Sequence, residues 1–535
     1  IRPLLGIFVI RSGNMWRSAL CVLSVASVAS CGNILALVPA PFYSHQIAFA
    51  QIWKELSLRG HHVTLMTTVP HRDPTLINLT EIDTSNAFQI VTHKYQISKT
   101  AENILNMWNW YDIFAQINSD AAEEQLSNPK VQELIHKRNN FNFDVVFVES
   151  YYAEFLAFGK LYNCPTVLTT SVDGHTLFQH AMGNPAHPIL HTDYATPFHG
   201  KLTFRERVIS TIYSVYVSLF ETFYVLPGKQ RIIDKYFTNM SLKLESLISD
   251  VDMMFLDVNP VIQDARAIGP TTINIGMERN IVPKRPLTKD LKDFMDNAKE
   301  GFIYFSLGSN VRSKELNHDT LTAIVQAFKE IPYKVVWKFE GDDLPGKPDN
   351  VKLVRWAPQQ IVLKHPNIKL FITQGGLQSM EEAVYSKVPM VVIPFFFDQF
   401  KNARLMEIKH IGKTIGRKPS VKKDELKNAI IEVITDPKYI NSVRRLGRLS
   451  KDVPMTGLEK AIWWTEYIIR NKGAKHLRNP ASDIPFYQYF LLDVISFIIV
   501  VTFCILIVLC IFMKKSVQVV RGILRTMTTK SKKLE

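Results

Sequence analysis

The densest group of residues that could do chemistry lies in the last third of the chain, between Trp356 and Gln399. Its centre is the pair Gly375-Gly376, which separates a strand-like apolar run from a helix-like segment. Glycines at such a turn let the backbone approach a phosphate, and the N-terminus of the following helix supplies free N–H groups and the positive end of a dipole. The pattern therefore predicts a phosphate-binding turn.

Side chains around this turn suit the other parts of a nucleotide. Ser379 and Glu382 are three residues apart and share one helix face, where a carboxylate can accept hydrogen bonds from a ribose diol. Trp356 offers a flat ring on which a base stacks. Asp398 and Gln399 follow the next apolar run, so we expect their polar groups to face the same cleft and to bind sugar hydroxyls.

A candidate base lies far away in the sequence, at His45. It follows the apolar run 32–39 and starts a helix-like segment for which Ser44 is the expected N-cap. The positive end of the helix dipole disfavours an imidazolium and keeps the ring able to accept a proton. A lone histidine in this position is more often a capping or packing residue. We interpret His61 and His62 as surface or packing residues.

Alternating strand-like and helix-like segments must carry these residues. The run 32–39 predicts a buried strand, Ala48, Ile52 and Leu56 mark the apolar face of a helix, and 63–66 predicts the next strand. This βαβ unit indicates a parallel sheet. Further strands are predicted at 143–148, 165–168, 301–305, 333–337, 351–353, 370–372 and 390–393.

The two series of strands predict an α/β protein with two Rossmann-like, doubly wound domains that face each other across a cleft. We expect the first domain at 32–282, a linker at 283–300 and the second domain, with closing helices, at 301–485. Ligands bind outside the carboxyl ends of the strands in such folds. The apolar stretch 205–226 is interpreted as a membrane-surface segment, a wall of the acceptor site or ordinary core.

Both ends of the chain resemble targeting segments. Residues 1–31 comprise an upstream segment and a signal peptide that begins at Met15. Residues 486–513 predict one transmembrane helix, because the uncharged run 494–513 is about 30 Å long as a helix. The basic tail 514–535 predicts a cytosolic C-terminus. Since Lys532-Lys533 resembles a dilysine retrieval signal, we expect a single-pass protein of the endoplasmic reticulum membrane with a lumenal body.

Composition argues against several other classes. The 535 residues carry a formal net charge of +14, but seven basic residues and one acidic residue lie after Met513, so nucleic-acid binding is not expected. Of the five cysteines, all but Cys164 lie in the apolar ends, which argues against a disulfide or a cysteine metal cluster. Asp250 and Asp252 have the spacing of a metal-binding pair but are interpreted as a helix end.

The run from Trp356 to Gln399 resembles the signature of the UDP-glycosyltransferase family, the membrane-bound glucosyl- and glucuronosyltransferases of animals. The resemblance covers nearly the whole chain and implies a GT-B type fold. It implies that the uridine is held by Trp356 and Gln359, the ribose by Glu382, the diphosphate by Ser309, Gln374 and Gln378, and the transferred sugar by Asp398 and Gln399. Gly375, Gly376 and Ser379 complete this donor site.

The resemblance also assigns the catalytic pair. Tyr43-Ser44-His45 and Arg59-Gly60-His61 match the family's opening motif, which implies that His45 is the general base. Glu149 ends a strand where the family commonly has Asp, and its added methylene lengthens the reach but keeps the charge. Gln374 stands where the family usually has histidine, so it donates a hydrogen bond without a positive charge.

The implied reaction is an inverting transfer of a hexose from a UDP-sugar to a hydroxyl of a small lipophilic acceptor. We expect glucose. UDP-glucuronate is an alternative donor, because Arg266 stands where glucuronosyl relatives carry Arg. A non-catalytic lumenal carrier of lipophilic ligands is a second alternative. The UDP-sugar is a co-substrate, no metal or other cofactor is expected, the membrane is a partner, and homo-oligomer formation stays open.

Overall fold

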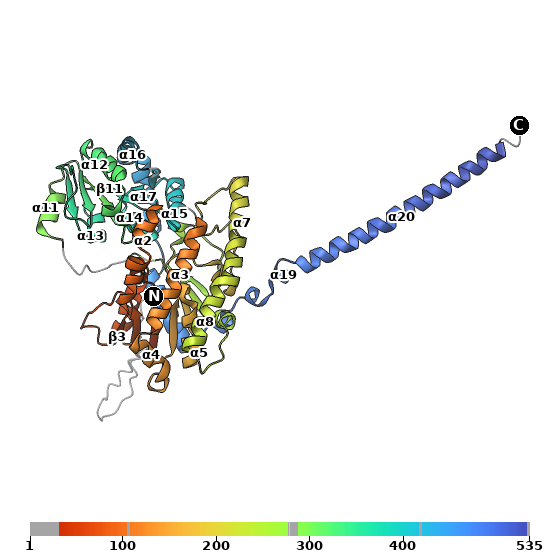
Figure 1. Ribbon diagram of the computed structural model, residues 1–535, viewed down its shortest axis with the longest axis horizontal. Coiled ribbons are helices and arrows are strands. Elements are labelled where there is room, and N and C mark those ends of the chain that lie inside the picture. The colour runs from red at the N-terminus through yellow and green to blue at the C-terminus, as the bar shows by residue number, and fades with distance from the viewer. Residues whose placement is uncertain (1–30, 104–106, 277, 279–286, 417–419, 532–535) are drawn as a thin grey trace, which may run out of the picture. The chain divides into compact units, whose positions relative to one another are not determined.

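The computed structural model describes residues 31–103, 107–276, 278, 287–416 and 420–531. Within these ranges the chain forms two parallel β-sheets with helices packed around them, followed by a long C-terminal helix (Figure 1). The predicted class, two doubly wound α/β sheets and an apolar C-terminal helix, is confirmed. The predicted signal peptide up to residue 30 and the pair Lys532-Lys533 lie outside the described residues.

The first sheet has seven parallel strands in the order β3-β2-β1-β4-β5-β6-β7. The order reverses between β1 and β4, and this switch point is where doubly wound sheets bind ligands. The strands are β1 (Asn33–Val38), β2 (His62–Thr67), β3 (Leu79–Asp83), β4 (Val145–Glu149), β5 (Thr166–Thr170), β6 (Met253–Leu256) and β7 (Thr272–Asn274).

The second sheet has six parallel strands in the order β10-β9-β8-β11-β12-β13, with its switch point between β8 and β11. The strands are β8 (Phe302–Ser306), β9 (Lys334–Lys338), β10 (Val351–Val354), β11 (Ile368–Thr373), β12 (Met390–Val392) and β13 (Gly412–Thr414). Each switch point thus lies beside one of the two predicted site segments, His45 after β1 and the glycine turn after β11.

Helices connect the strands of both sheets and cover their faces. Those before the second sheet are α1 (Tyr43–Leu58), α2 (Ile97–Asn103), α3 (Met107–Leu126), α4 (Pro129–His136), α5 (Ala157–Tyr162), α6 (Thr176–Ala181), α7 (Phe204–Phe220), the π-helical η5 (Glu221–Val225), α8 (Leu226–Tyr236), α9 (Leu244–Ser249) and α10 (Pro260–Gln263). Those that follow are α11 (Lys289–Asp296), α12 (His318–Lys329), α13 (Gln359–Leu363), α14 (Leu377–Ser386), α15 (Asp398–Ile408), α16 (Lys423–Thr435), α17 (Pro437–Leu449), α18 (Gly457–Asn471), α19 (Phe486–Tyr489) and α20 (Leu492–Ser531).

The helix α18 follows the second sheet in sequence but packs on the first. Its Ala461, Ile462 and Ile468 are fully buried in the same cluster as Trp53 of α1 and Phe147 of β4. One face of the first sheet is therefore covered by α1 and α18 together. The domain ranges 32–282 and 301–485 stay a prediction. The first sheet is covered in part by α18, which lies within the range predicted for the second domain.

Gly457 starts α18 at a point of close backbone approach. A Cβ at this position would lie 2.1 Å from the carbonyl oxygen of Ile275. We expect Gly457→Ala to lower the melting temperature, because backbone atoms must shift to admit the methyl group. In Gly228→Ala the nearest atom is the mobile end of Arg231 at 3.8 Å, so this helical control should be neutral or stabilising. Equal thermal unfolding curves for both variants would contradict the close approach.

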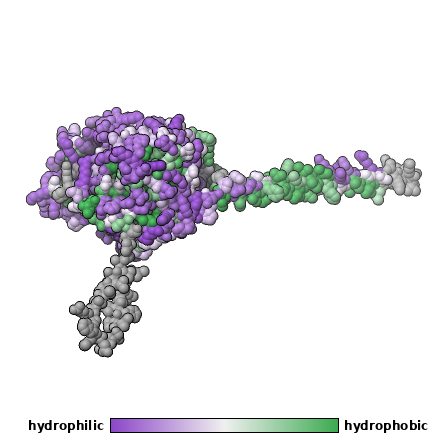
Figure 2. Space-filling model, turned by 90° about the horizontal axis from the view of Figure 1, so that it is seen from below, coloured by the Kyte–Doolittle hydropathy of each residue, from purple (hydrophilic) through white to green (hydrophobic). Residues whose placement is uncertain are grey.

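In the part of the chain that the structure describes, two helices are long and apolar enough to cross a membrane. The most apolar 18-residue window of Leu492–Thr528 in α20 has a mean hydropathy of 3.4 and is not buried, and Figure 2 shows a long apolar stretch on this helix. The corresponding window of Phe204–Tyr236 has a mean hydropathy of 1.3. In α7 one face is buried at Ser210, Tyr213 and Val217, and the opposite face is exposed. The stretch 205–226 is therefore not ordinary core, and α20 indicates membrane anchoring.

Candidate active site

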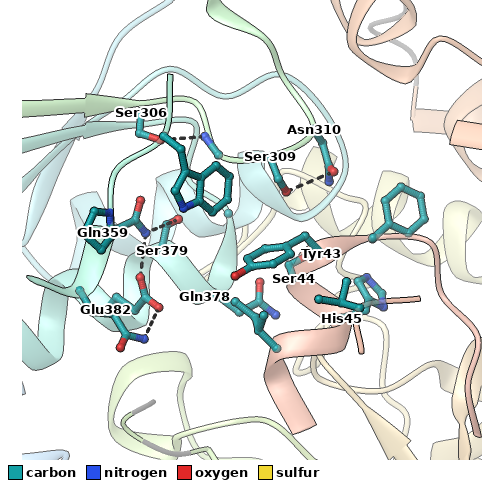
Figure 3. Close-up of a pocket in the computed structure, with 18 of the residues that line it drawn as sticks. Tyr43, Ser44, His45, Ser306, Ser309, Asn310, Gln359, Gln378, Ser379 and Glu382 are labelled. Atoms are coloured by element: carbon teal, nitrogen blue, oxygen red, sulfur yellow. Dashed lines mark hydrogen bonds between the residues drawn. The ribbon is translucent and has the colours of Figure 1, made fainter. Parts of the chain in front are cut away.

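The carboxyl ends of the two sheets line one cavity of about 1310 Å³. Eleven of the thirteen predicted site residues line it, namely His45, Ser309, Trp356, Gln359, Gln374, Gly376, Gln378, Ser379, Glu382, Asp398 and Gln399. Of the other two, Glu149 is hydrogen-bonded to His45, and Gly375 forms part of the glycine turn and packs against Val392. Figure 3 shows side chains from the first half, Tyr43 to His45, opposite those of the second.

His45 and Glu149 form a hydrogen-bonded pair at the switch point of the first sheet. His45 Nδ1 lies 2.5 Å from Glu149 Oε1, and the Glu149 side chain is fully buried. Glu149 Oε2 accepts a hydrogen bond from the backbone N–H of Ala40 at 3.2 Å, which holds the carboxylate in place. The helix begins two residues before His45 with Phe42 at the N-cap, so the prediction that Ser44 is the N-cap was wrong.

This geometry decides which imidazole nitrogen is available. A buried carboxylate accepts hydrogen bonds, so Nδ1 of His45 carries the proton that lies toward Glu149. Nε2 of the same ring is then unprotonated and able to take a proton from a group in the cavity. Phe42 and Tyr151 lie with ring centroids 5.6 and 5.8 Å from the imidazole and restrict its rotation.

Ser171 links the base to the second half of the molecule. Its Oγ is 3.2 Å from His45 Nδ1, and its carbonyl oxygen accepts a hydrogen bond from Gln378 Nε2 at 3.2 Å. Ser171 directly follows β5, at the same sheet edge as Glu149. Sequence reasoning missed this residue, although its position after a predicted strand could have indicated it.

The glycine turn after β11 has the conformation expected of it. Gly375 has a φ of +84°, and a Cβ there would lie 2.8 Å from Val392 Cγ1, so a larger residue would be strained. Gly376 is the N-cap of α14. Gln374 packs under Gly308, and its Oε1 is buried without a hydrogen-bond partner among the described residues. The turn therefore places a helix N-terminus and the side chain of Gln374 at the cavity.

Glu382 is held by two amides of α13. Its Oε2 accepts from Gln359 Nε2 at 2.8 Å and its Oε1 from Gln360 Nε2 at 2.8 Å. Gln359 Nε2 also lies 3.1 Å from Ser379 Oγ. These bonds fix the direction of the carboxylate, as the dashed lines in Figure 3 show. Gln360 was not predicted as a site residue, although it adjoins Gln359.

Trp356 stands at the outer end of the cavity and is 56% exposed, so its ring face is open to a stacking partner. The ring of Tyr43 meets it edge-on with centroids 5.6 Å apart, and Lys338 Nζ lies 5.5 Å from its centroid. Burial and the Glu382 carboxylate raise the pKa of Tyr43, so its hydroxyl stays protonated. Neither Tyr43 nor Lys338 was assigned a binding role from the sequence.

Asp398 and Gln399 begin α15 after a strained residue. Phe397 has φ +54° and ψ −129°, a backbone conformation that costs on the order of 1–3 kcal/mol and tends to occur at functional sites. Asp398 Oδ2 accepts from Asn402 Nδ2 at 2.7 Å. Gln399 Oε1 accepts from the backbone N–H of Phe395 at 2.8 Å, which fixes the orientation of the amide.

Asp398 makes folding stability depend on pH. Burial raises its pKa to about 6. The folded protein holds this proton more tightly than the unfolded chain, so the protonated carboxyl adds to the free energy of unfolding. This added stability is fully present below about pH 4 and is lost as pH rises through about 6. We expect Asp398→Asn to flatten the fall in melting temperature between these pH values. The exposed control Asp349→Asn should keep the wild-type slope, and an unchanged slope in Asp398→Asn would contradict the assignment.

Two features singled out in the sequence lie elsewhere. Arg266 does not line the cavity, and its Nη1 forms a 2.9 Å ion pair with Asp173. Asp250 caps the end of α9 and pairs with Lys160, while Asp252 accepts from the backbone N–H of Thr166. Asp250 thus lies at a helix end, as predicted, and Asp252 in addition holds the start of β5.

Two doubly wound sheets that enclose a common cavity define the GT-B architecture of glycosyltransferases. A solved structure of this kind, described as the glycotransferase of kitacinnamycin, superposes with a TM-score of 0.53 at 18% identity and covers 83% of this chain and 99% of its own. The likeness concerns the fold.

The family follows from the sequence comparisons. The model of the family "UDP-glucoronosyl and UDP-glucosyl transferase" matches residues 33–530, so the chain belongs to this family and is a UDP-glycosyltransferase. The chain is 32% identical over 490 residues to the UDP-glycosyltransferase UGT5 of Dactylopius coccus, which covers 90% of this chain and 91% of that protein. It is 30% identical over 519 residues to human UDP-glucuronosyltransferase 2B7, covering 91% and 94%.

Proposed function

We propose that the protein transfers glucose from UDP-glucose to a hydroxyl of a small lipophilic acceptor, with inversion at the anomeric carbon. The observation that carries the proposal is the His45–Glu149 pair, which opens onto the same cavity as the glycine turn and the N-terminus of α14. A general base and a phosphate-binding turn in one cavity are what a direct displacement requires.

The reaction is a single displacement. Nε2 of His45 takes the proton of the acceptor hydroxyl, and the oxygen forms a bond to the anomeric carbon. The bond between that carbon and the diphosphate oxygen breaks on the opposite face, and UDP leaves with the electron pair. Glu149 accepts the hydrogen bond from Nδ1 and stabilises the imidazolium that forms, in the way a buried carboxylate supports a catalytic histidine.

The second half of the site would hold the donor. Trp356 stacks on the uracil, Gln359 contacts the uridine and Glu382 binds the ribose hydroxyls. The diphosphate lies at the glycine turn, where the N-terminus of α14 and neutral donors stabilise the charge that develops on UDP. These neutral donors are Ser309, Gln374 and Gln378. Asp398 and Gln399 bind the hydroxyls of the sugar.

The charges around the cavity favour a neutral hexose over a glucuronate. Asp398 supplies a carboxyl group where the sugar would lie. Arg266 is paired with Asp173 and lies outside the cavity lining. Besides histidines, four cationic residues line the described part of the cavity. Lys338, Lys352 and Arg355 each form an ion pair with an acidic residue, and Lys54 belongs to α1. None belongs to α15, which carries Asp398 and Gln399.

A side-by-side assay tests the donor. The full chain in membranes is given a mixture of phenolic acceptors with either UDP-glucose or UDP-glucuronate, and the products are identified by mass. We expect a gain of one hexose residue with UDP-glucose and little product with UDP-glucuronate. Transfer of glucuronate alone would overturn the donor assignment, and binding of phenols without UDP release would favour a carrier.

We further propose a location for this activity in the endoplasmic reticulum. The apolar segment of α20 would span the membrane, with Lys514 and Lys515 at its cytosolic edge and the sheets in the lumen. Protease digestion of sealed microsomes tests this topology. We expect the body to be protected and an epitope at the C-terminus to be cleaved, and the reverse pattern would overturn the assignment.

A further inference from the structure

A second, smaller cavity adjoins the first on the side of the base. Its volume is about 50 Å³, enough for three to five water-sized groups at about 10–15 Å³ each, but not for a whole aromatic ring. The residues that line both cavities are Phe114, Asn118, Tyr151, Tyr194 and Phe397. We call this smaller cavity the side chamber. The two cavities therefore adjoin along these five side chains.

A row of rings connects the base to the side chamber. The ring centroids of His45 and Tyr151 are 5.8 Å apart, those of Tyr151 and Tyr194 6.5 Å, and those of Tyr194 and His175 6.1 Å. His175 lines the chamber. An elongated apolar molecule whose reacting hydroxyl meets His45 would therefore lie along aromatic surface, with its other end toward the chamber.

The inner end of the side chamber is polar. The hydroxyl of Tyr111 is hydrogen-bonded to Glu221 Oε1 and lies 2.5 Å from His175 Nε2. Burial, together with the Glu221 carboxylate, holds the pKa of Tyr111 well above its usual value, so the phenol stays a donor. A carboxylate offers about four acceptor positions, so Glu221 can accept further hydrogen bonds. The chamber thus favours a group that donates.

Ser150 marks an unfilled hydrogen-bonding position in this chamber. The residue lines the chamber and is 1% exposed, and its Oγ has no hydrogen-bond partner among the described residues. Leaving a buried hydroxyl unpaired costs about 1–3 kcal/mol, so such groups call for an explanation. The nearby cation Lys229 is not free to take an anionic ligand, because it pairs with Glu154 at 2.8 Å.

Glu221 lies on an irregular turn between two helices. Glu221 and Val225 bound the π-helical turn η5 between α7 and α8, and both residues line the chamber. A π turn changes the register of side chains around the helix axis and is frequent at functional sites. Here it joins α7, which has an exposed apolar face, to α8, whose Leu226 and Lys229 also line the chamber.

We propose that the side chamber is a distal acceptor subsite, which binds a second hydroxyl of an elongated lipophilic acceptor through Glu221 and Ser150. The inference rests on the proposed function, because the first hydroxyl must lie at His45. It narrows the acceptor class to lipophilic molecules with a hydrogen-bond donor at each end.

Two acceptors that differ by one hydroxyl test the subsite. 4-Phenylphenol and 4,4′-biphenol share one skeleton, and either hydroxyl of the second can react, which alone gives a twofold advantage. The full chain in membranes should show a KM for 4,4′-biphenol at least about tenfold lower than for 4-phenylphenol. Glu221→Gln and Ser150→Ala should each remove most of this difference while changing the KM for 4-phenylphenol less than twofold. Glu124→Gln, an exposed carboxylate of α3, serves as the matched control.

Dissociation constants for both phenols, measured by intrinsic fluorescence, give a readout that needs no turnover. Preferential binding of 4,4′-biphenol that is lost in Glu221→Gln supports the subsite even if no product forms. The absence of product would then contradict the proposed function and leave the subsite supported. Equal losses for both phenols in properly folded variants, or a wild-type preference within twofold, would overturn the subsite. Thermal unfolding identifies variants that fail to fold. If Glu221→Gln is one of them, the binding preference of Ser150→Ala, which is the smaller change, tests the subsite.

Discussion

Replacement of His45 by Ala is expected to lower kcat by about 10²–10⁴-fold, the usual contribution of a general base. The KM for the UDP-sugar should change little, because the proposed donor contacts come from the second sheet and its helices, whereas His45 belongs to α1. Rates measured under saturating donor, together with a binding titration of UDP, separate the two effects.

The matched control for this experiment is His62→Ala. His62 is an exposed histidine at the start of β2 and should be replaceable without loss of rate. Glu149→Gln removes the charge that supports the imidazolium and should give an intermediate loss. A His45→Ala variant with normal turnover would remove the proposed base, whatever else the cavity binds.

Glu382→Gln is expected to raise the KM for the UDP-sugar by about 10–100-fold, because a hydrogen bond to a charged group contributes about 1.5–3 kcal/mol. The carboxylate is oriented by Gln359 and Gln360, and the variant loses both the charge and this pairing. The acceptor KM should be unchanged, since the proposed acceptor position is on the side of α1 and Tyr151. Initial-rate measurements with each substrate varied in turn distinguish the two constants.

Glu245→Gln provides the control for this prediction, because Glu245 is an exposed carboxylate in the first turn of α9. It should leave both constants at the wild-type values. If Glu382→Gln bound UDP-sugar as tightly as the wild type, the carboxylate would have no part in holding the ribose, and its role would be confined to packing α13 against α14.

The strands that carry the site could be predicted because they are buried on both faces. β1, β4, β8 and β11 are apolar runs of five or six residues, and such runs stand out in a sequence. The edge strand β3 was not predicted, because its residues Leu79–Asp83 include two acids and a threonine and are only partly buried. β7 and β13 have three residues each and include polar residues, whereas the equally short β12 is wholly apolar and was predicted.

The site was predictable where its residues follow a strand or start a helix, since the parallel sheet brings all those positions to one edge. What could not be predicted are contacts that exist only after the two halves meet. Ser171 touches His45 and Gln378, and Tyr43 touches Trp356, from opposite sides of the cavity. Neither pairing leaves a periodic or compositional trace in the sequence.

The return of α18 to the first sheet has a consequence for how the molecule can be divided and how it can move. A shortened chain that stops before Gly457 would keep every strand yet uncover Ile52 and Trp53, so the first half should not survive as a separate soluble fragment. The polypeptide also passes between the halves twice, before α11 and again after α17. Two connections restrict the relative motion of the two halves to a rotation about the line between them. We therefore expect the cavity to open to substrates on the side away from these connections.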